Sequence, residues 1–152
     1  MNMTDMEHFL QQAAASGDDI WYSQPASADA IAQLQSAIGY PLPEPLCQWL
    51  SRYGAIGVGD RFISGIIDNQ PLEMEGGNIF ADTAFLRDEQ PSLPPHFVVI
   101  QCHDDGAYCL DLSDKSCPPV VNFEWGNSNK FADSFEQFLE HFCYAEDDFE
   151  DE

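Results

Sequence analysis

The sequence predicts a single domain in which amphipathic helices accompany an antiparallel β-meander. The chain has 152 residues, a common length for one domain, and 44% of them are hydrophobic, so it can bury a substantial core. Three short apolar runs between residues 97 and 123 are separated by short polar segments, which favours antiparallel strands. Elsewhere, apolar residues recur every three or four positions behind capping residues, a spacing typical of helices that pack on one face.

The first 25 residues are expected to form an N-terminal helical extension. Thr4-Asp5-Met6-Glu7 fits a capping box, because Thr4 and Glu7 can each satisfy a backbone donor of the first turn. A helix this short must dock on the rest of the protein to persist. Its apolar face consists of Met6, Phe9, Leu10 and Ala13. The apolar patch Ile20-Trp21-Tyr22 follows it.

Two helices are expected next, and they should pack as a pair because a short, proline-rich connector joins them. Ser27 can cap the first helix and Gly39 closes it. Its apolar stripe is Ile31, Leu34 and Ile38. The second begins near Pro43 or Glu44 and ends at Gly54. Its apolar stripe is Leu46, Trp49, Leu50 and Tyr53.

The glycine-rich segment 54–59 does not match a nucleotide-binding loop, because its glycine spacing fits neither Gly-x-Gly-x-x-Gly nor a P-loop. These glycines are expected to turn the chain from helix into a strand at residues 61–67. A further helix is predicted from Asn78 to Glu89, with Asn78 as its cap. The side chains expected to face inward from it are Phe80, Ala84 and Phe85.

The predicted meander consists of strands at residues 97–102, 107–112 and 120–123. Asp105-Gly106 lies between the first two, and Asp-Gly is a strong hairpin signal. Along the middle strand, alternate side chains should point to opposite faces of the sheet. One set is Tyr108, Leu110 and Leu112, and the other is Ala107, Cys109 and Asp111.

The last predicted helix starts at a second capping box, Ser134-Phe135-Glu136-Gln137, with Gln137 as the reciprocal partner. Its expected buried face is Phe135, Phe138, Leu139 and Phe142. Residues 146–152 form an acidic tail that is too charged to pack and is expected to fray, although Phe149 could tether it.

Charge is the most unusual property of the chain. Five Lys and Arg residues stand against 27 Asp and Glu residues, which gives a formal net charge of −22. Such a surface repels nucleic acid and anionic membranes, and it attracts basic proteins. The sequence therefore predicts a basic protein partner and no direct nucleic-acid or membrane partner. General solubility is the alternative explanation of the charge.

The five cysteines point to a cytoplasmic protein with reduced, mostly buried thiols. Their number is odd and no Cys-x-x-Cys pair occurs among positions 47, 102, 109, 117 and 143. The first residues show no signal-peptide pattern, and no run approaches the ~20 apolar residues of a membrane span.

The residues give no basis for a catalytic, cofactor or metal site. His103 and Cys102 are adjacent, so on a strand they would point to opposite faces, and the spacing of the other cysteines does not suit zinc. The aspartates near residue 105 do not follow the spacing of a calcium loop. No Gly-x-Ser-x-Gly motif occurs, and a hydrolase with a Cys–His pair is the least favoured alternative.

Several segments resemble one known family when they are taken in order. They are residues 38–50 with their Ile-Gly, Leu-Pro and Trp-Leu pairs, Tyr53-Gly54, residues 105–112, Pro119-Val120 and residues 132–139. This order is similar to that of the SUKH superfamily, which includes Knr-like cell-wall-assembly regulators and bacterial immunity proteins. The sequence departs from it at Tyr53-Gly54-Ala55, where the family usually has Asn-Gly-Gly.

The resemblance implies a single α+β domain, here residues 26–145, in which helices pack around a twisted, mostly antiparallel sheet. It also implies a non-enzymatic binding role. Bacterial relatives commonly neutralise toxins, many of them nucleases, by direct association, whereas eukaryotic relatives act as regulatory scaffolds. No catalytic residues are carried over.

We therefore expect an immunity protein that neutralises a basic, for example nuclease, toxin through an acidic surface. A regulatory or scaffold module without a toxin is the alternative. The candidate partner-binding residues are Asp104, Asp105 and Trp125. Trp125 lies among polar residues after the last predicted strand, where it is either an interface anchor or a lid on the core. Trp21 presents the same two alternatives.

Overall fold

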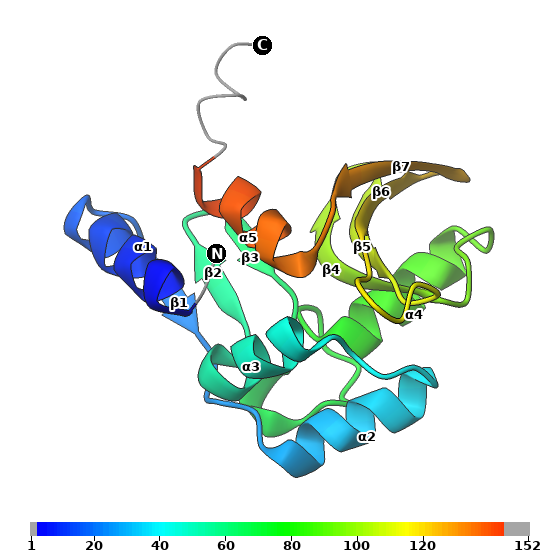
Figure 1. The fold of residues 1–152 in the computed structure, drawn as a ribbon, viewed down its shortest axis with the longest axis horizontal. Helices are drawn as coiled ribbons and strands as arrows, with labels where there is room; N and C mark the ends of the chain where they lie inside the picture. Colours follow the sequence, from blue (N-terminus) through cyan, green and yellow to red (C-terminus); the bar gives the residue numbers. More distant parts are fainter. Residues whose placement is uncertain (1–2, 145–152) are drawn as a thin grey trace.

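A computed structural model describes residues 3–144 of the chain. Its elements are, in order, α1 (Met3–Ala15), β1 (Ile20–Tyr22), α2 (Ala28–Ile38), α3 (Glu44–Tyr53), β2 (Ile56–Val58), β3 (Arg61–Ile63), the 3₁₀ turn η1 (Ile67–Asn69), α4 (Ile79–Glu89), β4 (Phe97–His103), β5 (Gly106–Asp111), β6 (Val120–Glu124), β7 (Asn127–Ala132) and α5 (Phe135–Tyr144). Figure 1 shows how these elements are arranged.

The strands form two antiparallel sheets, and the fold belongs to the α+β class that the sequence predicts. The smaller sheet has the order β1-β2-β3, and the larger has the order β4-β5-β6-β7. The sheets are joined where the Ser64 N–H donates to the Ile100 carbonyl at 2.8 Å. In Figure 1, α5 lies between the two sheets, while α4 lies below the larger one.

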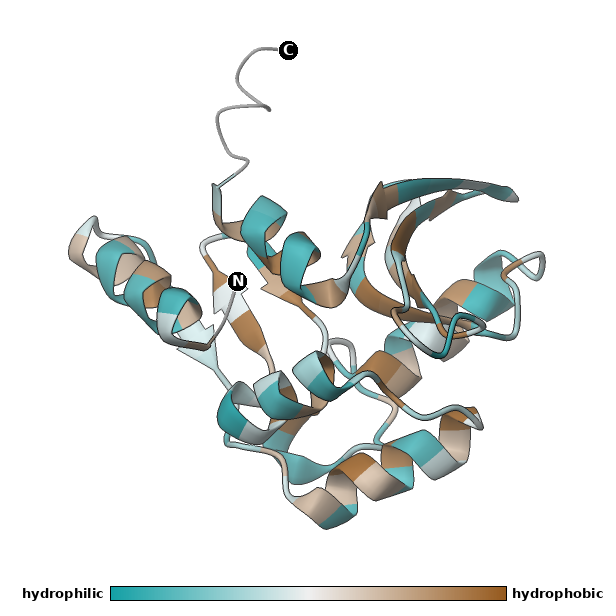
Figure 2. Ribbon diagram, in the orientation of Figure 1, coloured by the Kyte–Doolittle hydropathy of each residue, from teal (hydrophilic) through white to brown (hydrophobic). Residues whose placement is uncertain are grey.

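The central strands of the larger sheet bury side chains on both faces, and the two sets along β5 alternate as predicted. Leu110 and Leu112 belong to the main core, which the helices α1, α2, α3 and α5 share with both sheets. Ala107 and Cys109 point the other way, into a smaller core that includes Leu86 of α4. In Figure 2, hydrophobic residues concentrate on the central strands, whereas the helices alternate between hydrophobic and hydrophilic residues.

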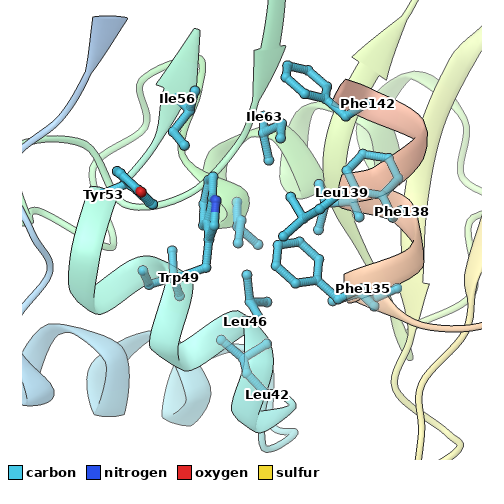
Figure 3. Packing of buried hydrophobic residues seen from close by; sticks show 14 of the residues in the cluster. Leu42, Leu46, Trp49, Tyr53, Ile56, Ile63, Phe135, Phe138, Leu139 and Phe142 are labelled. Carbon is cyan, nitrogen blue, oxygen red and sulfur yellow. The ribbon is translucent and has the colours of Figure 1, made fainter. Parts of the chain in front are cut away.

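The main core is built around the stripe of α3 and the face of α5, both of which are buried as predicted. Trp49 is fully buried and meets Phe135 edge-on, with 5.8 Å between the ring centroids (Figure 3). These two helices come from opposite halves of the chain. Their contact therefore closes the domain around one hydrophobic centre.

The predicted helix caps form, with one difference. Ser27 Oγ accepts the Ala30 N–H at 3.1 Å, and Gly39 ends α2 with a φ of 80°. At α5, Ser134 Oγ accepts the Gln137 N–H at 3.1 Å. The Gln137 side chain reaches back to the N–H of Asp133, and not to that of Ser134 as the capping-box pattern predicts.

The N-terminal helix docks on the rest of the protein. Met6 is fully buried in the main core, and its sulfur lies 3.8 Å from the Cys143 thiol of α5. The helix begins at Met3, one residue before the predicted cap Thr4. The domain boundary at residue 25 stays a prediction, although β1 before it belongs to the smaller sheet. The acidic tail and Phe149 lie outside the described residues.

Three strands of the structure were not predicted from the sequence. β1 and β2 have only three residues each, and β2 falls within the glycine-rich segment that was expected to be a turn. β7 is mostly polar and exposed, so it shows no apolar alternation. The strand predicted at residues 61–67 ends at Ile63, because the chain then leaves the small sheet.

The inward face predicted for α4 is right only in part, because Phe80 packs against the main core whereas Phe85 does not. Phe85 is 48% exposed, whereas Asp82 and Thr83 are buried. Thr83 Oγ1 accepts the Val99 N–H at 2.9 Å, which ties α4 to β4 through a polar contact that apolar spacing does not reveal. Asn78 occupies the N-cap position, but its side chain does not cap the helix. Its Oδ1 accepts the Ile67 N–H at 2.6 Å and holds the preceding loop.

Candidate functional site

The three sequence-predicted site residues lie together at one end of the larger sheet. Asp104 and Asp105 form the two-residue turn between β4 and β5, because His103 pairs with Gly106. Trp125 and Gly126 form the corresponding turn between β6 and β7. The pairing of Gly106 with Glu124 sets these turns side by side. We call the region formed by residues 88–90, 103–106 and 122–126 the hairpin end; the start of β7, at the right of Figure 1, marks it.

Gly106 allows the two hairpins to approach each other. A Cβ atom at this position would lie 1.9 Å from the Phe123 carbonyl oxygen, so any side chain would collide with backbone. The Asp-Gly signal thus predicts the hairpin correctly, but Gly106 is the first residue of β5, and not part of the turn. Glycine is required here for close backbone approach.

Gln90 holds the two turns together. Its side chain is nearly inaccessible to solvent, with 2% of the residue exposed. Its Nε2 donates to the Asp105 carbonyl at 3.1 Å, and its Oε1 accepts the Trp125 N–H at 2.6 Å. This role of Gln90 was not predicted, since a single glutamine after a helix carries no signal of it in the sequence.

Trp125 is exposed and occupies an unfavourable backbone conformation. Its exposed fraction is 60%, so it is not a lid on the core. Its φ is 48° and that of Gly126 is 87°, and two positive φ values in a two-residue turn are typical of type I′, which favours Asn-Gly. A bulky residue with a positive φ costs about 1–2 kcal/mol. The turn therefore keeps an exposed indole at the expense of stability.

Carboxylates are concentrated in the segments that form the hairpin end. Asp88, Glu89, Asp104 and Asp105 are exposed and Glu124 is half-buried. His103 links the β4–β5 turn to β6. Its Nδ1 accepts the Asp105 N–H at 3.3 Å, and its Nε2 lies 2.7 Å from Asn122 Oδ1. This pattern places the ring proton on Nε2, where it can be donated to the amide oxygen.

The cations of the described chain are engaged away from the hairpin end. Arg52 pairs with Glu7 at 2.8 Å, and Lys130 pairs with Asp133. Arg61 donates to the backbone carbonyl of Phe142. Arg87 donates to the backbone carbonyls of Pro94 and Phe97. Lys115 follows β5, at the other end of the sheet. The hairpin end thus has a negative potential with an aromatic side chain at its tip.

Three of the cysteine thiols have a raised pKa, which is the opposite of nucleophilic activation. Burial raises the pKa of the Cys109 and Cys143 thiols to about 12. Desolvation by the surrounding protein, together with the neighbouring Asp82 carboxylate, raises that of Cys102 to about 12 as well, although the residue is exposed. These thiols stay protonated at neutral pH, whereas a catalytic thiol needs a lowered pKa. Within residues 3–144, no three His, Cys, Asp or Glu side chains are placed to hold a metal ion.

The fold and the hairpin end define a small α+β domain whose most distinctive feature is an exposed acidic surface with an aromatic tip. The SMI1 / KNR4 family (SUKH-1) matches residues 25–141, and the chain belongs to this family. No curated protein matches the chain. No helix in the described part of the chain is both long and apolar enough to cross a membrane.

Proposed function

We propose that this protein is a non-enzymatic immunity protein, which binds and neutralises a basic toxin through the hairpin end. Membership of the SUKH-1 family supports a role in protein interaction. Nuclease toxins are the class to test first, because a domain that binds nucleic acid must itself carry a basic surface. The reduced, high-pKa thiols suit a cytoplasmic site of action.

The exposed Trp125 in a strained turn is the observation that carries this proposal. A tryptophan in an interface is frequently a hot spot, and hot spots lie in a ring of contacts that excludes water. Strain of this kind in a folded protein is found mainly at functional sites. Most of the indole surface is exposed, so packing against residues 3–144 does not explain why this turn holds Trp instead of Asn.

The carboxylates around Trp125 supply the attraction for a basic partner. A net charge of −22 steers a cationic protein toward the surface and raises the association rate at low ionic strength. The indole then provides buried contact area once the complex has formed. Charge would thus govern association, and Trp125 would govern dissociation.

Two variants of the hairpin end test this division. In complex with a basic toxin domain copurified from the producing cells, Trp125→Asn should weaken binding roughly 30-fold, mainly by faster dissociation. The double variant D104N/D105N should mainly slow association. The control variant is E73Q/E75Q, which removes two exposed carboxylates from the loop before α4. If D104N/D105N and E73Q/E75Q slow association equally, the hairpin end has no special role in attracting the partner.

Salt gives a second readout of the same complex. The association rate should fall steeply as ionic strength rises from ~0.01 to ~0.15 M. A rate that does not depend on salt would contradict electrostatic steering. If the chain instead copurifies with a neutral, stable assembly and does not protect cells from any toxin, the alternative of a regulatory or scaffold module holds.

A further inference from the structure

A hollow lies at the end of the molecule opposite the hairpin end. It has a volume of about 1190 Å³ and is bounded by α1, β1 and α3. In Figure 1, α1 and β1 lie at the left end of the long axis, and the start of β7 lies at the right end. Leu10 and Ala14 of α1 and Cys47 of α3 contribute to its apolar lining.

The floor of this hollow is an open sheet edge. β1 is the outer strand of the smaller sheet, and among residues 3–144 it pairs with β2 alone. The ladder bonds on either side of β1 run from Ser23 N–H to the Ala55 carbonyl and from Gly59 N–H to the Asp19 carbonyl. In an antiparallel pair, hydrogen-bonded residues alternate with non-bonded ones. The backbone groups of Ile20 and Tyr22 therefore point away from β2, toward the open edge.

Exposed aromatic rings stand on both faces of this edge. Trp21 is 46% exposed and stacks on Phe62, with 5.6 Å between the ring centroids. Tyr22 is 57% exposed on the other face and meets Tyr53 edge-on at 6.0 Å. An extended segment that pairs with β1 would find an aromatic contact for the side chains on each of its faces.

The charged residues around the β1 edge are mostly acidic, which favours a basic binding partner. Asp18 and Asp19 directly precede β1, and Asp60 lies in the adjoining β2–β3 turn; all three are exposed. Glu7 and Glu44 line the hollow, where Arg52 is the single cation among the lining residues and already pairs with Glu7. A segment that carries Lys or Arg is therefore attracted to this surface.

Two other occupants are disfavoured by the same charges. A second copy of the chain would bring another net charge of −22 to the edge. The chain's own residues 145–152 include six acidic residues, so they would be repelled as well. Exposed edges of this kind accept a partner strand readily unless charge or proline blocks them.

We propose that the β1 edge binds an extended, basic segment of a protein partner by strand addition. Backbone hydrogen bonds to Ile20 and Tyr22 supply affinity, and the aromatic rings at Trp21 and Tyr22 select side chains. The surface is separate from the hairpin end, so its test does not depend on the proposed function.

The test uses an acetylated and amidated peptide of alternating Lys and Val as the probe. Its binding to the full chain is followed by amide chemical shifts at ~0.15 M ionic strength. The expected result is saturable binding with shift changes centred on residues 19–23. The same peptide with N-methylated central residues keeps its charge but lacks backbone donors, so it should bind at least about tenfold more weakly.

Two variants of the protein complete the test. Ile20→Pro removes the outward N–H without a loss to the β1–β2 ladder, and it should weaken peptide binding. Ile20→Ala keeps the N–H and is the matched control for the lost side chain. Equal binding of both peptides, or shift changes confined to the hairpin end, would overturn the proposal. So would a dimer, formed without peptide, that Ile20→Pro dissociates, because the occupant would then be a second copy.

Discussion

At the hairpin end, the backbone of Trp125 is held by a buried side chain while its own side chain stays in solvent. Gln90 accepts the Trp125 N–H and donates to the Asp105 carbonyl, so a single residue satisfies one backbone group in each turn. Gly106 permits the close pairing behind them. The position of the indole is thus determined by residues that do not themselves face a partner.

Replacement of Trp125 by asparagine should stabilise the fold while it removes the proposed anchor. Asn-Gly suits a type I′ turn, so Trp125→Asn should raise the free energy of unfolding by about 1 kcal/mol. Urea denaturation measures this change. Trp125→Ala is the control, because it removes the ring but keeps a side chain at positive φ. A Trp125→Asn protein no more stable than Trp125→Ala would contradict strain at this residue.

At the scale of elements, α5 connects the parts of the protein that lie farthest apart in sequence. Its buried face meets Trp49 of α3 through Phe135, and Cys143 contacts Met6 of α1. The helix is only ten residues long, so its stability depends on packing and on its cap. The capping contacts at Ser134 and Gln137 therefore support the whole main core.

Removal of the α5 cap should destabilise the whole domain. Ser134→Ala leaves the Gln137 N–H without its partner, and the expected cost is about 1 kcal/mol in the free energy of unfolding. Thermal and urea unfolding both report it. Ser134→Asp restores an acceptor at the same position and should recover most of the loss. If both variants lose the same stability, the hydrogen bond to Gln137 is not what Ser134 contributes.

At the scale of the whole molecule, charge and shape divide the surface into two distant regions. Four of the five cations already contact carboxylates or backbone carbonyls within the described part of the chain. Because five cations stand against 27 acidic residues, most of the negative charge is not neutralised. The hairpin end and the β1 edge lie at opposite ends of the long axis (Figure 1). One basic partner that wraps the domain, or two different partners, would fit this arrangement.

The excess of negative charge should make the fold more stable when salt is added. Self-repulsion among carboxylates opposes the compact state, and ions screen it. The urea midpoint should therefore rise between ~0.01 and ~0.15 M NaCl. Sodium perchlorate at equal ionic strength is the control, because screening at these concentrations depends on charge and not on the kind of anion. A midpoint that falls with salt would show that the charges are arranged to attract.

The sequence by itself determined the long helices, the main strands and the family. Capping residues and apolar spacing are local signals, so α2, α3 and α5 could be located from Ser27, Ser134 and the buried stripes. Asp104, Asp105 and Trp125 could also be selected from turn chemistry and charge. Only the tertiary structure decided what depends on contacts between distant segments. The short strands β1 and β2 exist because they pair with each other, Gln90 matters because two hairpins meet at it, and Trp125 proves exposed because it lies in the turn between β6 and β7 and not on a core face.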